Sequence, residues 1–111
     1  MINYNLPFHM LIMVDIDDTI CYYEAGIEKG NYALANPYVD RIEKVNKLFD
    51  EGHTIIYWTA RGTMTGINWF KITIDQLEKW GCKYHELRMN KPAYDLFIDD
   101  KNVESKIYFS S

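Results

Sequence analysis

Residues that cross-link or interrupt a chain are scarce in this sequence. It has two cysteines, three prolines and six glycines in 111 residues, and its net charge is −4. Cys21 and Cys82 match no metal-ligand or redox spacing, so we interpret both as reduced and buried, as expected in the cytoplasm. The lack of a basic excess argues against a dedicated nucleic-acid or membrane-surface module. The longest uncharged apolar run, residues 10–14, is too short for a signal peptide or a membrane span.

Apolar and aromatic side chains, by contrast, are plentiful. Hydrophobic residues make up 48% of the chain and aromatic residues 15%, well above the content of disordered chains. At this length a single domain is expected. We place it over residues 1–111, with residues 1–9 as an N-terminal extension and residues 20–36 as a flap of ordered loop.

Apolar strands and amphipathic helices alternate along the sequence. Strands are predicted at 10–14, 53–58, near 82–87 and at 94–98, and helices from residue 37 to Gly52 and from about 65 to 80. This alternation predicts parallel βαβ units. The expected fold is therefore a three-layer α/β/α sandwich with a mainly parallel, Rossmann-like sheet.

Several local features set the expected element boundaries. The run 10–14 is predicted to be buried on both faces of the sheet. Asn36 and Pro37 suit the N-cap and the first position of a helix, and Gly52 and Gly81 suit the residues that end the two helices. The predicted apolar stripe of the second helix consists of Ile67, Phe70, Ile74 and Leu77.

Polar clusters follow three of the predicted strands, at 15–19, 59–63 and 99–100. In parallel sheets ligands bind beyond the carboxyl ends of the strands, so these clusters should converge on one site. Two carboxylates about 4 Å apart repel by roughly 4 kcal/mol at an effective dielectric of about 20. A cluster of aspartates therefore calls for a cation, and Mg²⁺ with oxygen ligands fits best. Lys91 would supply a second positive charge.

The order of these clusters resembles the four motifs of the haloacid dehalogenase superfamily, in its phosphatase branch. The motifs are the segment 15–19, then Thr59, then Lys91, then the pair 99–100. The resemblance spans residues 10 to about 102. It is closest to small members without a cap domain from capsular polysaccharide biosynthesis, through residues 57–62 and 91–101.

This resemblance implies a role for each motif residue. Asp15 would be the nucleophile that forms an aspartyl phosphate, and Asp17 would be the general acid and base. Thr59 would donate hydrogen bonds to the phosphoryl oxygens, and Lys91 would neutralise charge. The implied Mg²⁺ ligands are Asp15, the main-chain carbonyl of Asp17, and Asp100, with Asp99 bound through water or to Lys91.

The expected function is thus a cytoplasmic, Mg²⁺-dependent phosphomonoester hydrolase acting on a small sugar phosphate or a related metabolite. The gaps between motifs leave no room for a cap domain, so substrate preference is expected to reside in the flap and in Arg61. The candidate substrate-binding residues are Arg61, Ala60, Tyr22 and Tyr32. Self-association is expected to help screen the open crevice.

Three alternatives stay open from the sequence alone. The first is a phosphatase that acts on nucleotides or on nucleic-acid phosphate ends. The second is a phosphoacceptor receiver module, whose motifs are similar but come in a different order along the chain. The third is a binding subunit without catalytic activity.

Overall fold

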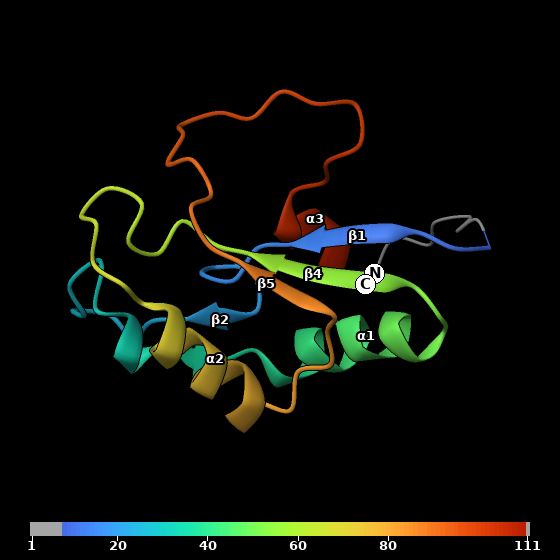
Figure 1. Cartoon of the computed structure of the whole chain (residues 1–111), viewed down its shortest axis with the longest axis horizontal. Helices are drawn as coiled ribbons and strands as arrows, with labels where there is room; N and C mark the ends of the chain where they lie inside the picture. The colour runs from blue at the N-terminus through green and yellow to red at the C-terminus, as the bar shows by residue number, and fades with distance from the viewer. Residues whose placement is uncertain (1–7, 111) are drawn as a thin grey trace.

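The computed structural model describes residues 8–110. Three strands, β1 (Leu11–Val14), β4 (Thr54–Trp58) and β5 (Glu86–Arg88), form a parallel sheet in the order β1-β4-β5 (Figure 1). Val14 pairs with Tyr57, and Tyr57 pairs with Leu87. The protein therefore has the α/β architecture that the alternating pattern predicted.

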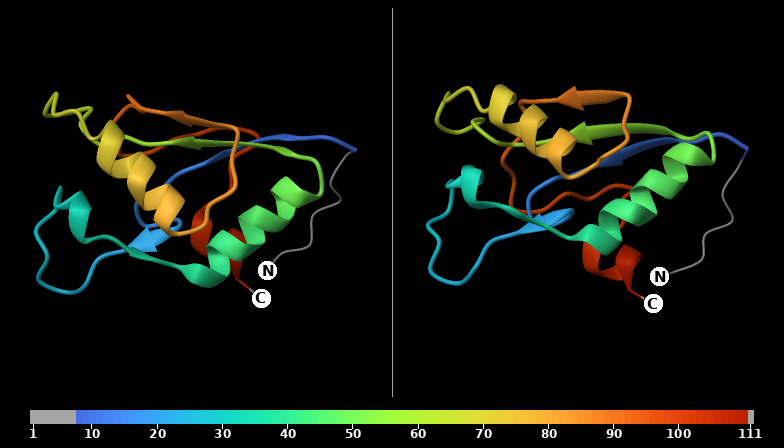
Figure 2. Two further views of the ribbon diagram at one scale, coloured as in Figure 1. Left: turned by 60° about the horizontal axis from the view of Figure 1, so that its bottom comes forward. Right: turned by 90° about the horizontal axis from the view of Figure 1, so that it is seen from below.

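Two helices connect the strands and lie on the same face of the sheet (Figure 2). Helix α1 (Val39–Asp50) links β1 to β4 by way of the flap, and α2 (Phe70–Lys79) links β4 to β5. The core between helices and sheet is formed by buried apolar side chains from both layers. Its central members are Ile42, Val45, Leu48, Ile55, Tyr57 and Leu77. A short C-terminal helix, α3 (Ser105–Phe109), packs Tyr108 and Phe109 against this core.

Strand β1 is buried on one face only, so the prediction of burial on both faces is wrong. Val14 is buried, whereas Leu11 and Met13 are 60% and 41% exposed. Side chains alternate across a strand, so Leu11 and Met13 point away from the face that carries Val14 and the core. A continuous apolar run favours burial of its side chains, but it does not show whether another element of the chain covers the second face of the sheet.

The prediction of a strand at residues 94–98 is also wrong. These residues form no strand, and their apolar side chains are exposed, up to 76% for Leu96 and 89% for Ile98. They belong to the long loop between β5 and α3 (Figure 1). A short apolar run does not reveal whether a neighbouring strand will accept its hydrogen bonds, so periodicity alone could not settle this segment.

The flap contains more regular structure than an ordered loop. Strand β2 (Cys21–Tyr22) pairs in antiparallel fashion with β3 (Asn36–Pro37), and a 3₁₀ helix, η1 (Tyr32–Leu34), lies between them. Because Asn36 and Pro37 form β3, they do not begin α1, as had been predicted. Tyr38 is the N-cap residue, and its N–H donates to the carbonyl of Ile20.

The observed C-terminal ends of α1 and α2 agree with the predicted ends better than the observed first residues agree with the predicted starts. Gly52 and Gly81 follow α1 and α2 with φ of +98° and +71°, conformations that favour glycine. Helix α2 begins at Phe70 and not near residue 65, since the Asn68 side chain accepts a hydrogen bond from the Phe70 N–H. Ile67 and Phe70 are exposed, so the predicted apolar stripe is wrong at those two positions. Strand β5 begins at Glu86, later than the predicted 82.

Both cysteines are free thiols, as predicted. Cys21 is buried, Cys82 is partly buried, and burial raises the pKa of Cys82 to about 11. Of the predicted N-terminal extension, residues 1–7 lie outside the described residues. Among residues 8–110, none of the helices is long and apolar enough to cross a membrane.

Candidate functional site

The carboxyl edge of the sheet brings together residues that are far apart in the sequence. Asp15 directly follows β1, Thr59 directly follows β4, and Lys91 lies three residues after β5. The Lys91 N–H donates to the Thr59 carbonyl (3.0 Å), and the Thr63 hydroxyl donates to the Lys91 carbonyl (2.8 Å). These two bonds fix the main chain of Lys91 beside the end of β4.

Asp15 forms an ion pair with Lys91. The Asp15 Oδ1 and Lys91 Nζ atoms are 3.3 Å apart, and the Thr19 hydroxyl donates to Asp15 Oδ2 at 3.2 Å. Burial raises the pKa of Asp15 above its ordinary value, and the positive charge of Lys91 opposes this shift. The Asp15 side chain is still 36% exposed. It is thus a carboxylate with a charged partner and access from solvent.

Asp17 is held by a second cation. Arg61 donates from Nε to Oδ2 (3.0 Å) and from Nη2 to Oδ1 (2.9 Å) of Asp17, a bidentate ion pair. The Tyr23 hydroxyl also donates to Oδ1, at 2.5 Å. Burial and this bond raise the pKa of Tyr23, so its phenol keeps the proton that it donates. The carboxylate is oriented from two sides while its side chain stays 23% exposed.

Every N–H of the Arg61 guanidinium already faces an acceptor. Besides the two bonds to Asp17, Nη1 donates to Thr73 (3.1 Å) and Gln76 (2.6 Å), and Nη2 faces the Cys21 sulfur at 4.0 Å. The Arg61 side chain has no exposed surface. A direct contact with substrate stays a prediction for Arg61, but in this arrangement its donors are committed to the protein.

Thr59 is buried next to these two ion pairs. Its hydroxyl oxygen accepts a hydrogen bond from the Arg61 main-chain N–H at 3.1 Å. The hydroxyl keeps its own proton, which can be donated to another acceptor. Thr59 therefore keeps a hydroxyl proton that can be donated at the carboxyl edge of the sheet, and its contact with a phosphoryl group stays a prediction.

The loop after β1 is braced around the two aspartates. Asp18 has φ of +62°, and its N–H donates to the Cys21 carbonyl at 2.9 Å. The Ser105 hydroxyl of α3 donates to the Asp18 carbonyl at 3.2 Å. These bonds close a tight turn, which places Asp15 and Asp17 at the same edge of the sheet.

Asp99 and Asp100 lie in the exposed loop between β5 and α3. Asp99 accepts a hydrogen bond from the main-chain N–H of Lys101, at 3.0 Å. Within residues 8–110, no group of three or more His, Cys, Asp or Glu side chains is close enough together to hold a metal ion. Mg²⁺ binding by Asp99 or Asp100 stays a prediction.

The remaining candidate residues lie around the flap. The Tyr32 ring lies 5.0 Å from the Arg61 guanidinium carbon and 5.1 Å from the Trp69 ring. Tyr22 instead packs on Tyr38, with ring centroids 4.8 Å apart. The Ala60 carbonyl accepts the Thr63 N–H in the turn after β4. Of the two candidate tyrosines, Tyr22 and Tyr32, it is thus Tyr32 that contacts Arg61, which holds Asp17.

Sequence reasoning missed the residues that hold Asp17 and Arg61 in place. These are Tyr23 in the flap and Thr73 and Gln76 on α2. Thr73 is fully buried, one turn before Leu77 on the same helix face. The sequence did carry one sign of these contacts, because Thr73 is a polar residue at a core position of a helix. A buried hydroxyl needs a hydrogen-bond partner.

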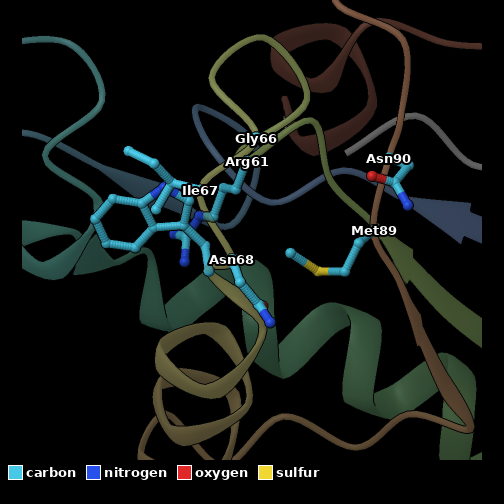
Figure 3. Close-up of a pocket in the computed structure, with 7 residues that line it drawn as sticks. Arg61, Gly66, Ile67, Asn68, Met89 and Asn90 are labelled. Carbon is cyan, nitrogen blue, oxygen red and sulfur yellow. The ribbon is translucent and has the colours of Figure 1, made fainter.

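A pocket of about 290 Å³ adjoins this site (Figure 3). It lies between the loop that precedes α2 and the residues that follow β5. Its lining residues are Arg61, Gly66, Ile67, Asn68, Trp69, Met89 and Asn90. The pocket was not predicted from the sequence, because it is formed by two loops without a recognisable motif.

The fold is similar to that of a solved structure from Vibrio cholerae, described as a structural genomics target. The two chains are 27% identical, with a TM-score of 0.76, over 90% of this chain and 87% of that chain. No protein-family model and no curated protein matches the chain. The likeness supports an α/β fold over nearly the whole chain, and the printed description of that structure names no activity.

Proposed function

We propose that the protein is a Mg²⁺-dependent phosphomonoester hydrolase that works through an aspartyl phosphate on Asp15. The observation that carries the proposal is the Asp15–Lys91 ion pair at the carboxyl edge of the sheet, with Thr59 and Asp17 beside it. A solvent-accessible carboxylate held next to a lysine and a threonine hydroxyl is suited to attack a phosphoryl group. The proposed substrate class is a small sugar phosphate or a related metabolite, in the cytoplasm.

The finer fold assignment belongs to the same proposal. We place the chain among the haloacid dehalogenase-like phosphatases, with a three-layer, Rossmann-like sandwich and no cap domain. The order of Asp15, Thr59 and Lys91 along parallel strands supports this assignment. The free thiols of Cys21 and Cys82 agree with a reducing compartment.

The proposed reaction has two steps. A carboxylate oxygen of Asp15 attacks phosphorus, and the bond from phosphorus to the ester oxygen breaks. The leaving alkoxide takes a proton from Asp17, which must first gain that proton and give up one of its hydrogen bonds from Arg61. Asp17 then accepts a proton from the water that attacks the aspartyl phosphate. The second step releases inorganic phosphate and restores the Asp15 carboxylate. Throughout, the Thr59 hydroxyl and the Lys91 ammonium stabilise the charge on the phosphoryl oxygens.

The chemistry of the donors fits a divalent cation. Mg²⁺ typically takes one or two carboxylates and completes its ligands with water and substrate phosphate. The exposed carboxylate of Asp15 and the main-chain carbonyl of Asp17 would hold it, joined by Asp100 from the loop after β5. When bound, the ion neutralises phosphate charge that Lys91 alone cannot balance.

Removal of divalent metal is expected to lower activity by about 100-fold or more, since a metal ion contributes several kcal/mol to such transition states. The measurement is hydrolysis of para-nitrophenyl phosphate after extensive chelation, followed by titration with MgCl₂. Recovery with Mg²⁺ is the control for protein damage. Full activity in the chelated protein would contradict the metal requirement.

Asp17→Asn is expected to slow turnover by about 10²–10⁴-fold, because proton transfer to the leaving group and from water is lost. The variant also weakens the ion pair with Arg61, so rates are normalised to the folded fraction measured by circular dichroism. Formation of a phosphoenzyme on residue 17 in the Asp15→Asn variant would reverse the two roles.

A further inference from the structure

One face of the sheet is covered only in part. Helices α1 and α2 pack on the face that carries Val14, whereas the long loop between β5 and α3 lies on the opposite side of the sheet (Figure 1 and Figure 2). On that opposite face Met13 is the register partner of Ile56. Ile56 is 3% exposed, but Met13 and Leu11 are 41% and 60% exposed. Cover on this side therefore reaches the central strand β4 but not the edge strand β1.

The loop on that side of the sheet adds further exposed apolar side chains. They are Tyr94, Leu96, Phe97, Ile98 and Val103, which are between 41% and 89% exposed. We call these five residues, together with Leu11 and Met13, the open face. Large apolar side chains have about 150–250 Å² of surface, so the open face exposes roughly 800 Å². The largest apolar patch on a typical monomer is smaller, at about 300–600 Å².

Strand β1 also lacks the features that keep an edge strand from pairing with another chain. Among residues 8–110 its partner in the sheet is β4, and its second edge carries no strand. All four of its residues, Leu11–Val14, are apolar. Edge strands of monomers usually carry a charge, a proline or a bulge that opposes such pairing. An apolar edge beside an apolar face is therefore typical of a surface that a partner covers.

The charges around the open face favour a second copy of this chain as that partner. Apart from the pair 99–100, which the proposed function assigns to Mg²⁺, the loop after residue 94 and α3 carry Asp95, Glu104, Lys101 and Lys106. Two acids and two lysines have no net charge, so they do not select a partner of one sign. Across a twofold axis the acids of one copy can face the lysines of the other. The apolar part of the face is complementary to itself.

We propose that two copies of this chain associate through their open faces across a twofold axis. A stable interface of standard size covers about 800 Å² on each partner, which matches the roughly 800 Å² that the open face exposes. Twofold dimers are the commonest soluble oligomers, and both subunits contribute the same patch. This contact lies on the face of the sheet and not on the crevice at its carboxyl edge. The proposal therefore goes beyond the proposed function and does not depend on it.

Two substitutions introduce a charge into the open face on different elements. Ile98→Glu changes a loop side chain that is 89% exposed, so folding should be unaffected. Met13→Glu changes β1, on the side away from Val14. Val39→Glu is the matched control, because Val39 is 61% exposed at the start of α1, on the other face of the sheet. An acidic residue in the first turn of a helix is favourable, so this control should fold like the parent.

Sedimentation velocity of the full chain measures the association. Interfaces of this size have dissociation constants from micromolar to picomolar, so the parent and Val39→Glu are expected to be dimers at about 100 μM. Ile98→Glu and Met13→Glu should each raise the dissociation constant by about 100-fold or more. The reason is that a buried carboxylate without a partner loses its hydration, and the twofold axis introduces it twice. The parent dimer should persist in 0.5 M NaCl, because salt screens charges and not apolar contacts.

Hydrogen exchange locates the interface within the chain. The main-chain amides of residues 94–98 should exchange faster in Met13→Glu than in the parent at the same concentration, because the partner no longer covers them. The amides of α1 and α2 should exchange at the same rate in both proteins. Faster exchange confined to α1 and α2 would overturn the assignment to the open face.

Other outcomes would also overturn the proposal. A parent that sediments as a monomer at about 100 μM would do so, and slow exchange at residues 94–98 in that monomer would show that the loop covers the face within its own chain. A dimer that both charged variants leave intact would show that the copies meet elsewhere. A parent dimer that dissociates in 0.5 M NaCl would contradict an apolar interface.

Discussion

Asp15→Asn is expected to reduce phosphatase turnover by at least about 10³-fold, since loss of a nucleophile is among the largest effects of a single substitution in an enzyme. The amide has nearly the same shape but does not attack phosphorus to form an acyl phosphate. The ion pair with Lys91, at 3.3 Å, is lost at the same time. The measurement is steady-state hydrolysis of para-nitrophenyl phosphate at saturating Mg²⁺.

Asp18→Asn provides the matched control. It removes the same charge three residues along the chain, at an exposed position whose φ of +62° asparagine tolerates well. We expect this variant to keep activity within a few-fold of the parent. Residual activity of Asp15→Asn above about one per cent, or an equal loss in Asp18→Asn, would show that Asp15 is not the nucleophile.

The same substitution should affect stability in the opposite direction. Burial raises the pKa of Asp15 in the folded state above that of the unfolded chain. The folded state therefore binds this proton more tightly, so the side chain favours folding below its unfolded pKa. That contribution is lost as pH rises through the folded pKa. Asparagine carries no charge, so the Tm of metal-free Asp15→Asn relative to the parent should increase from pH 3.5 to pH 7.5.

The parts of the site that could be predicted from the sequence are those fixed by the sheet. A residue that directly follows a parallel strand lies at the carboxyl edge whatever the loops do, which is why Asp15 and Thr59 come together as expected. Lys91 joins them, since the hydrogen bond from its N–H to Thr59 holds the chain after β5 in place. The alternation of apolar strands and amphipathic helices was therefore sufficient to predict which residues lie at the carboxyl edge of the sheet.

The parts that were missed depend on partners that local pattern does not identify. The run 94–98 is apolar, yet it lies in a loop, and Asp99 and Asp100 lie in that loop with it. The hydrogen bonds from Arg61 to Asp17, Thr73 and Gln76, residues from 12 to 44 positions away, were also not predicted, whereas contact of Arg61 with substrate stays a prediction. Long-range polar contacts of this kind leave no periodic signal in the sequence.

Arg61→Ala is expected to destabilise the fold by about 3–5 kcal/mol, the usual cost of removing one partner of a buried ion pair. The side chain of Arg61 is wholly buried, and its loss leaves Asp17, Thr73 and Gln76 without their shared donor. For a domain whose free energy of unfolding is about 5–15 kcal/mol, that is a large fraction. Urea denaturation followed by circular dichroism measures the change.

Arg88→Ala is the control for this variant, because Arg88 also pairs with a carboxylate, Glu86, but both side chains are about half exposed (50% and 48%). Exposed pairs contribute little to stability, so the urea midpoint of Arg88→Ala should stay close to that of the parent. Arg61→Lys keeps the positive charge but loses the planar guanidinium that donates to both oxygens of Asp17. Its urea midpoint should therefore lie between those of Arg61→Ala and Arg88→Ala. Equal midpoints for Arg61→Ala and Arg88→Ala would contradict a buried, structural role for Arg61.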